Sequence, residues 1–183
     1  MRLKTHYTFS LGLLYLIDSF LIDSPYYLLV ITLLVSVIVN NLIDSLGHEI
    51  KGMYISRTPR THTIPRSAGW GLSVSIPLAL TLYFMPFKLP FNLYFHPSIG
   101  FVLVTVIDGA IAGLSHMLLD VFTEKGIYVK KKGKWRRFAL AHFCYDNPLA
   151  NGLADLLGVL MLFLAFYIHD YNLIYHYYHQ FFS

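Results

Sequence analysis

The feature that most constrains this chain is a series of apolar stretches about as long as a bilayer is thick. A helix needs roughly 20 mostly apolar residues to cross the hydrocarbon core of a membrane. Four stretches approach or reach that length: residues 25–42, 69–87, 99–119 and 149–168. A fifth, residues 7–22, is shorter and contains Asp18, and a cleaved signal peptide is the alternative interpretation for it. The pattern predicts an all-α, polytopic transmembrane bundle of about five spanning helices.

The composition excludes the water-soluble alternatives. Hydrophobic residues make up 56% of the 183 residues, charged residues make up 13%, and the mean hydropathy is +0.54. A soluble domain carries about 25% charged residues, so this chain has too little polar cover for a cytosolic enzyme or a nucleic-acid-binding domain. Cys144 is the only cysteine, so no disulfide can form within the chain. We expect residues 1–183 to form a single integral membrane domain.

The lysines and arginines predict the orientation of the helices. All but Lys88 of the 14 fall before the first helix, between the second and third, or between the fourth and fifth. Basic loops stay in the cytoplasm. We therefore expect a multi-pass protein of the cell membrane, with the N-terminus and the loops at about 45–67 and 121–147 inside.

Histidine and aspartate side chains gather on the same side of this topology. Asp44 and His48 are four residues apart at the inner end of the second helix, and His116 and Asp120 are four apart at the inner end of the fourth. A spacing of four puts two side chains on one helix face, one turn apart. Three more polar residues fall on this side: His6, His62 and Asn151. Because ionisable residues are costly near a membrane and tend to mark function, we interpret these residues as a metal or catalytic cluster facing the cytoplasm.

The ligand types restrict the metal and the substrate. Histidine and aspartate without paired cysteine suit zinc first, with manganese or iron(II) as alternatives, better than they suit calcium. Arg57 and Arg60 lie close to His62 and indicate an anionic substrate, because guanidinium forks match phosphate geometry. The alternative is that these arginines only set the topology. His48 is also a candidate general acid or base.

The order of these residues carries a family resemblance. It consists of an early His, an Asp followed by a His, a loop with Thr-His, and a helix ending His-x-x-x-Asp followed by Thr and Gly. Here the positions are His6, Asp44, His48, Thr61, His62, His116, Asp120, Thr123 and Gly126. The arrangement resembles the YdjM-like family of inner-membrane metal-dependent hydrolases, and a related group of uncharacterised membrane proteins from archaea and their viruses.

The resemblance implies a distant likeness to zinc-dependent phospholipase C and P1-type nucleases, in which helix-borne His and Asp hold zinc and phosphoesters are cleaved. By that analogy one metal site consists of four residues: Asp44, His62, His116 and Asp120. His6 would contribute to a second site. The implied function is a membrane-embedded, metal-dependent hydrolase that cleaves a phosphoester of a lipid or amphiphilic substrate at the cytoplasmic face.

In such a site the metal lowers the pKa of a bound water. Arg57 and Arg60 would neutralise the phosphate, and His48 or Asn151 would orient water or protonate the leaving group. Membrane lipid is the expected partner, since the basic segment at residues 128–138 lies next to a membrane helix.

Three alternatives stay open. A transporter or ion channel would use Asp108 and Asp155 as a relay inside the membrane. A non-catalytic membrane scaffold, viral or cellular, would need none of the cluster residues for its role. A regulatory module would bind a protein through the basic loop at residues 130–137.

Overall fold

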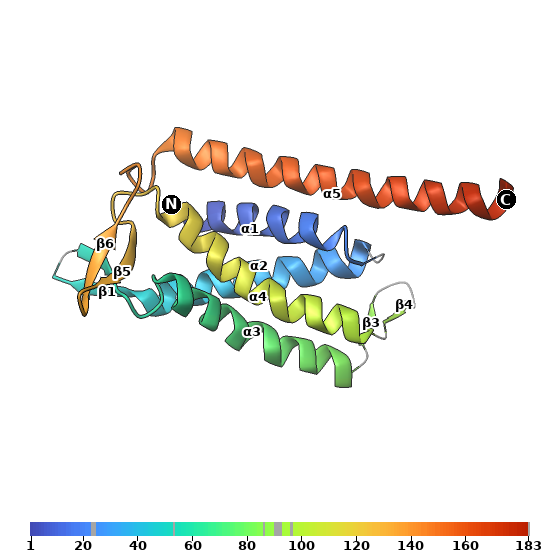
Figure 1. Cartoon of the computed structure of the whole chain (residues 1–183), viewed down its shortest axis with the longest axis horizontal. Coiled ribbons are helices and arrows are strands. Elements are labelled where there is room, and N and C mark those ends of the chain that lie inside the picture. Colours follow the sequence, from blue (N-terminus) through green and yellow to red (C-terminus); the bar gives the residue numbers. More distant parts are fainter. Residues whose placement is uncertain (23–24, 53, 86, 90–92, 96, 183) are drawn as a thin grey trace.

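The structure is a computed structural model that describes residues 1–22, 25–52, 54–85, 87–89, 93–95 and 97–182. In these residues it forms five helices and three two-stranded antiparallel hairpins (Figure 1). The elements in chain order are α1 Leu3–Asp18, α2 Pro25–Gly47, β1 His48–Lys51, β2 Tyr54–Arg57, α3 Ile64–Phe84, β3 Phe87–Leu89, β4 Leu93–Phe95, α4 Ile99–Asp120, β5 Ile127–Lys131, β6 Lys134–Phe138 and α5 Pro148–Phe182. The predicted all-α helical bundle is confirmed in outline, and short hairpins form in the connections between its helices.

The β5–β6 hairpin shows why these connections fold back as strands. Lys131 pairs with Lys134, so only Lys132 and Gly133 form the turn. Both have positive φ, 50° and 78°. A two-residue turn with positive φ at both positions matches the twist of antiparallel strands. Gly133 suits such a turn because glycine adopts positive φ without strain.

Four of the described helices are long and apolar enough to cross a membrane: Tyr27–Gly47, Ile64–Phe84, Ile99–Asp120 and Pro148–Tyr171. α1 is not among them. It has 16 residues and spans about 24 Å, and it begins and ends four residues earlier than the predicted stretch at 7–22. It packs between α2 and α5.

Small residues let the helices approach closely. A Cβ on Gly71 of α3 would lie 1.8 Å from the carbonyl oxygen of Gly109 in α4, and one on Gly12 of α1 would lie 2.0 Å from that of Gly158 in α5. Such contacts are typical of helices that associate within a bilayer, where close backbone packing replaces the hydrophobic drive.

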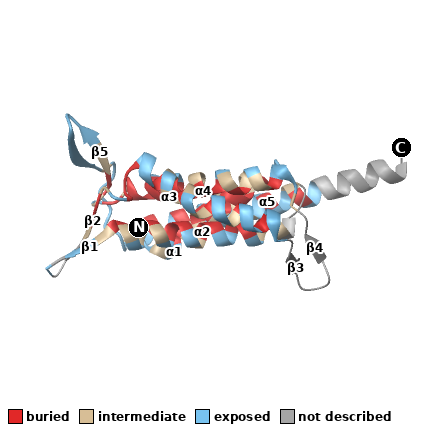
Figure 2. Ribbon diagram, turned by 90° about the horizontal axis from the view of Figure 1, so that it is seen from below, coloured by how far each residue is buried: buried red, intermediate tan, exposed pale blue. Residues whose placement is uncertain are grey.

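Figure 2 shows buried residues along the middle of the bundle and exposed residues over its outside, and large apolar side chains occur in both groups. Val35, Val39 and Ile43 of α2 are fully buried, whereas Leu103 and Ile107 of α4 are more than half exposed. Exposed aliphatic side chains also line α5. Continuous apolar surface of this kind marks a membrane or protein contact.

Candidate metal centre

The candidate site lies at the end of the bundle that carries β1–β2 and β5–β6 (Figure 1). α1 begins at this end and contributes His6, whereas α2 and α4 end here and contribute Asp44 and Asp120. The loop between β2 and α3 contributes His62. Segments far apart in the chain therefore meet at one end of the molecule.

Capping of α2 places His62 in this site. The last four carbonyl groups of a helix have no donor within it. The backbone N–H of Thr58 donates to one of these, the Gly47 carbonyl, at 2.8 Å, and Thr61 Oγ1 donates to the Ile43 carbonyl one turn earlier in α2, also at 2.8 Å. The loop is thereby held against the end of α2, with His62 fully buried.

Four ligand atoms face one another here, and we call them the four-atom cluster. They are Nε2 of His62, Nε2 of His116, Oδ1 of Asp44 and Oδ2 of Asp120. His62 Nε2 lies 3.6 Å from each of the two oxygens, and His116 Nε2 lies 3.4 Å from Asp44 Oδ1 and 3.3 Å from Asp120 Oδ2. In a tetrahedral shell with bonds of about 2.0–2.1 Å, ligand atoms are about 3.3–3.4 Å apart. An octahedral shell of that bond length brings neighbours to about 2.9 Å, so these four of the six separations among the ligand atoms are closer to the edges of a tetrahedron.

The tautomer of His62 is fixed by its neighbour. Thr61 has one hydroxyl proton, and the Ile43 carbonyl receives it. The hydroxyl oxygen therefore accepts from Nδ1 of His62, 2.9 Å away. Burial lowers the pKa of His62 to about 4, so the ring is neutral at pH 7 and its Nε2 presents a lone pair to the carboxylates.

Asn40 fixes His116 in the same way. The amide nitrogen of Asn40 donates to Ser10 Oγ at 2.9 Å and to the Ser36 carbonyl at 2.7 Å. Its Oδ1 is thus the acceptor that faces His116 Nδ1 at 2.8 Å. A neutral His116 then carries its proton on Nδ1 and presents Nε2 to the carboxylates. Such outer hydrogen bonds are how proteins orient metal-binding imidazoles.

Three atoms of the cluster are buried without a hydrogen-bond partner: His62 Nε2, His116 Nε2 and Asp120 Oδ2. Each unsatisfied buried polar atom costs about 1–3 kcal/mol. Lone pairs facing carboxylate oxygens also repel one another. One cation bound among these atoms would remove both costs, and two imidazoles with two carboxylates suit a divalent metal.

Arg57 holds the other oxygen of Asp120. Its Nη2 donates to Asp120 Oδ1 at 2.6 Å, and its Nη1 donates to Thr123 Oγ1 at 2.9 Å and to the Gly126 carbonyl at 3.0 Å. The side chain is only 5% exposed. The sequence predicted that Arg57 neutralises a bound phosphate, but a buried guanidinium with these contacts instead orients Asp120 and keeps it ionised.

His6 lies beside the cluster. Its ring stacks on that of His116, with centroids 3.9 Å apart and planes at 8°. His6 Nε2 lies 3.3 Å from Asp120 Oδ1, the oxygen that accepts from Arg57 and, at 3.1 Å, from the amino group of Met1. His6, His116 and Asp120 bring ligand atoms within 4.8 Å of one another. Because the Arg57 guanidinium already holds that oxygen, the geometry favours one metal in the four-atom cluster over a second at His6.

His48 lies where the cluster meets an open pocket. Its Nε2 is 3.8 Å from Asp44 Oδ1, and its ring centroid is 5.2 Å from that of His62. The pocket has a volume of about 450 Å³ and is lined by Leu3, Asn41, Asp44, Ser45, His48 and Ile50. Burial lowers the pKa of His48 below its usual 6.5, so its imidazole is neutral near pH 7 and able to accept a proton.

Comparison with known protein families identifies the family of this chain. The family described as "Protein of unknown function (DUF1286)" matches residues 1–119. The chain belongs to this family. No curated protein and no solved structure matches it. The segment that matches DUF1286 includes three of the four cluster ligands and ends one residue before the fourth, Asp120.

Two predicted residues lie apart from the cluster in this DUF1286 protein. Arg60 is exposed, and among the described residues no hydrogen bond or ion pair joins its guanidinium to the cluster. The Asn151 side chain accepts from the backbone N–H of Arg2 at 2.9 Å and donates to the carbonyls of Tyr145 and Asn147. That amide ties the start of α1 to α5, so its placement does not support the predicted catalytic role of Asn151.

The aspartates of the transporter alternative make separate contacts. Asp108 of α4 is buried and lies next to Asp18 of α1. Asp155 of α5 accepts from Thr5 Oγ1 at 3.4 Å. The contacts of the described residues do not join these two carboxyl groups into one path.

The sequence analysis missed the groups that orient the imidazoles. Asn40 lies four residues before Asp44 in an apolar helix, so the same helical spacing that revealed the ligands could have found it. Thr61 belonged to the family pattern, but the sequence analysis assigned it no function. Its hydroxyl donates to the Ile43 carbonyl of α2, which comes near only in the folded chain.

Proposed function

We propose that this DUF1286 protein is a multi-pass membrane protein that holds one divalent metal ion, zinc first, at its cytoplasmic end and hydrolyses a phosphoester of a lipid or another amphiphile. The observation that carries the proposal is the four-atom cluster. Its two imidazoles and two carboxylates are donors of the kind found in tetrahedral zinc sites, and the four His–Asp separations support such a shell. Manganese and calcium favour octahedral or larger oxygen shells, and the separations in the cluster fit these less well.

The surface of the bundle supports a membrane location. Large apolar side chains are exposed along α2, α3, α4 and α5, and they would face lipid tails. All but Lys88 of the basic residues belong to segments at the site end of the bundle. Since basic segments stay in the cytoplasm, this distribution favours a site that faces inward.

The residues around the cluster have separate parts in the proposed reaction. When bound, a divalent metal supplies a water of lowered pKa as nucleophile. His48 faces the pocket with a neutral imidazole and would accept or return a proton there. Arg57 would orient Asp120, and the exposed Arg60 remains the candidate for meeting the anionic group. Leu3 and Ile50 give the pocket an apolar edge suited to an amphiphile.

A non-catalytic, metal-stabilised membrane protein is the second candidate. Four protein ligands complete a tetrahedral shell, and closed shells are typical of structural zinc sites. On the hydrolase proposal the metal would need room for a water, and Asp44, the partly exposed residue at the pocket, would be the one to make that room. The two candidates agree on metal binding and differ on hydrolysis.

Metal content tests both candidates. Detergent-purified protein is expected to hold about one zinc per chain by elemental analysis, and His116→Ala is expected to hold none. His142→Asn is the matched control, because it removes an exposed imidazole outside the cluster and should retain the metal. Equal metal in wild type and His116→Ala, or none in either, would refute the metal site.

Hydrolysis separates the two candidates. Phosphate release from dioctanoyl phosphatidic acid and cleavage of bis(4-nitrophenyl) phosphate are the probes. His48→Gln is expected to keep its zinc and lose about 10²–10⁴-fold in rate, the usual contribution of a general acid or base. If zinc-loaded protein cleaved neither probe nor other phospholipid esters, hydrolysis would be refuted. The second candidate, a metal-stabilised membrane protein without catalysis, would then be the better description.

The native thiol tests the orientation. Cys144 is exposed and lies in the loop between β6 and α5. A membrane-impermeant maleimide is expected to label it only after cells are permeabilised. Met85→Cys in a Cys144→Ser background places the thiol at the opposite end of α3 and should label in intact cells. The reverse pattern would put the site on the outer face.

A further inference from the structure

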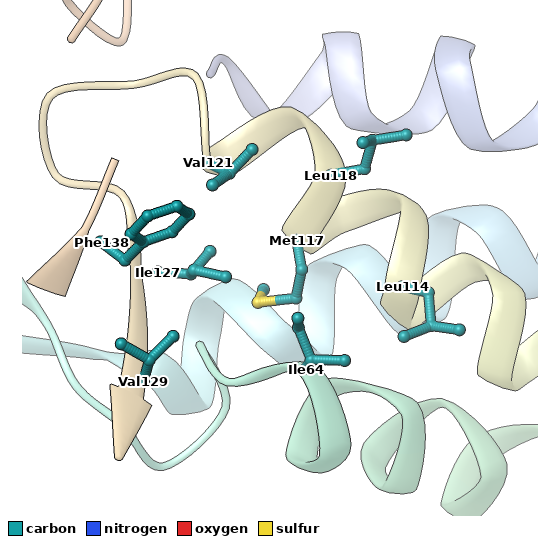
Figure 3. A pocket seen from close by; sticks show the side chains of 8 residues that line it. All are labelled: Ile64, Leu114, Met117, Leu118, Val121, Ile127, Val129 and Phe138. Atoms are coloured by element: carbon teal, nitrogen blue, oxygen red, sulfur yellow. The ribbon is translucent and has the colours of Figure 1, made fainter. Parts of the chain in front are cut away.

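An apolar groove lies between the end of α4, the start of α3 and the β5–β6 hairpin (Figure 3). Its volume is about 320 Å³, at the lower end of the roughly 300–1,000 Å³ of small-molecule pockets. The lining consists of Ile64, Leu114, Met117, Leu118, Val121, Ile127, Val129 and Phe138. A groove of this size and lining suits one hydrocarbon chain and offers no polar anchor for a water-soluble ligand.

The hairpin face that lines the groove becomes basic toward its tip. Residues directly opposite each other in an antiparallel pair share a face, and successive residues alternate between faces. Ile127 pairs with Phe138, and Val129 pairs with Arg136. The next pair on this face is Lys131 with Lys134. The groove therefore continues directly into three cationic side chains.

Cations on the opposite face of the hairpin are already engaged. Arg137 lies over the Tyr128 ring, 5.9 Å from its centroid, and donates to Ser56 Oγ at 3.3 Å. Lys130 Nζ lies 5.9 Å from the centroid of the Trp135 ring. By contrast, among the described residues no acidic or aromatic partner contacts the side chains of the groove face: Lys131, Lys134 and Arg136.

The groove opens toward the apolar outer surface of the bundle. Leu114 is 41% exposed and Leu118 is 50% exposed, and both line the groove and the lipid-facing side of α4. Basic segments just outside a membrane helix attract anionic headgroups. We propose that this groove binds one anionic phospholipid, with an acyl chain along Ile127, Val129 and Phe138 and the phosphate at the unpaired cations of the tip. The inference rests on the proposed membrane location and is independent of the metal and of hydrolysis.

Native mass spectrometry of detergent-solubilised protein tests the site, with an equimolar mixture of phosphatidylglycerol and phosphatidylcholine as the probe. Wild type is expected to retain one phosphatidylglycerol in preference to phosphatidylcholine. Lys134→Gln with Arg136→Gln is expected to lose about 30-fold of that preference, since each removed charge is worth about fivefold. Val129→Trp, which fills the groove, is expected to retain neither lipid.

Lys130→Gln with Lys132→Gln is the matched control, because it removes the same charge away from the groove face. This control is expected to keep the wild-type preference. An equal loss in the control, or lipid retention by Val129→Trp, would overturn the proposal. A wild-type dimer that dissociates when Val129 is replaced by Trp would also overturn the proposal, because a second copy of the chain would then occupy the groove. Zinc content should be unchanged in all these variants, so failure of the metal site would be recognised separately.

Discussion

Replacement of Thr61 by valine tests the orientation of the cluster from outside it. Valine has nearly the same shape as threonine but has no hydroxyl. The change removes the bond from Thr61 Oγ1 to the Ile43 carbonyl and removes the acceptor of His62 Nδ1. No ligand atom of the cluster is altered. Thr61→Ser keeps the hydroxyl and is the matched control.

The magnitude follows from the two lost hydrogen bonds. Removing an outer hydrogen bond from a metal-binding histidine typically lowers metal affinity by about 10–100-fold, which equals about 1.4–2.7 kcal/mol. The same change leaves His62 Nδ1 buried without an acceptor, at a cost of about 1–3 kcal/mol. We therefore expect zinc affinity to fall by about 10–100-fold in Thr61→Val and by less than about threefold in Thr61→Ser.

Competition with a fluorescent zinc chelator measures this affinity in detergent-solubilised protein. Unfolding of the metal-free variants is followed in parallel, to show that Thr61→Val remains folded. If folded Thr61→Val bound zinc as tightly as wild type, the His62 tautomer would not matter. The assignment of Nε2 as a metal ligand would then be refuted.

Three further substitutions test the packing around the site. Gly47→Ala would place a Cβ 2.0 Å from Thr61 Oγ1 and 2.4 Å from His62 Nδ1; we expect zinc to be lost from purified protein, and full zinc occupancy would contradict the loop geometry. Arg57→Gln removes the guanidinium that pairs with the buried Asp120 carboxylate, so the free energy of unfolding in mixed micelles should fall by about 3–5 kcal/mol, and a loss below about 1 kcal/mol would argue against this pairing. Gly71→Ala should lose about 1–3 kcal/mol through collision with α4, whereas Gly69→Ala in the same helix meets nothing within 4 Å and should be neutral or slightly stabilising.

The helices and the two His–Asp pairs at a spacing of four were predictable because their signals are local. Apolar length alone placed α2, α3, α4 and α5 approximately. The spacing of four placed His116 and Asp120 on one face, and their atoms do meet at 3.3 Å. For Asp44 and His48 the same spacing gave a looser approach of 3.8 Å, because α2 ends between them and His48 begins β1.

The roles of the arginines and amides were not predictable, since they depend on partners distant in the chain. Arg57 lies 63 residues before Asp120, and the turn containing Thr123 and Gly126 offers it two more acceptors. Asn151 is used by the backbone at the start of α1. A local sequence pattern shows which side chain is present but not which hydrogen-bond partner it has in the folded chain.

The sequence by itself determined that this chain forms apolar helices and that the imidazoles and carboxylates of the candidate site gather at one end of them. Hydrophobic length and helical period depend only on neighbouring residues, so both can be taken from the amino-acid order. Only the tertiary structure decided which four atoms converge, which nitrogen of each ring faces the carboxylates, and which arginine is buried. Those outcomes depend on close helix contacts at glycines and on loop groups that bond to carbonyls near the end of α2, and such contacts exist only once the segments have packed together.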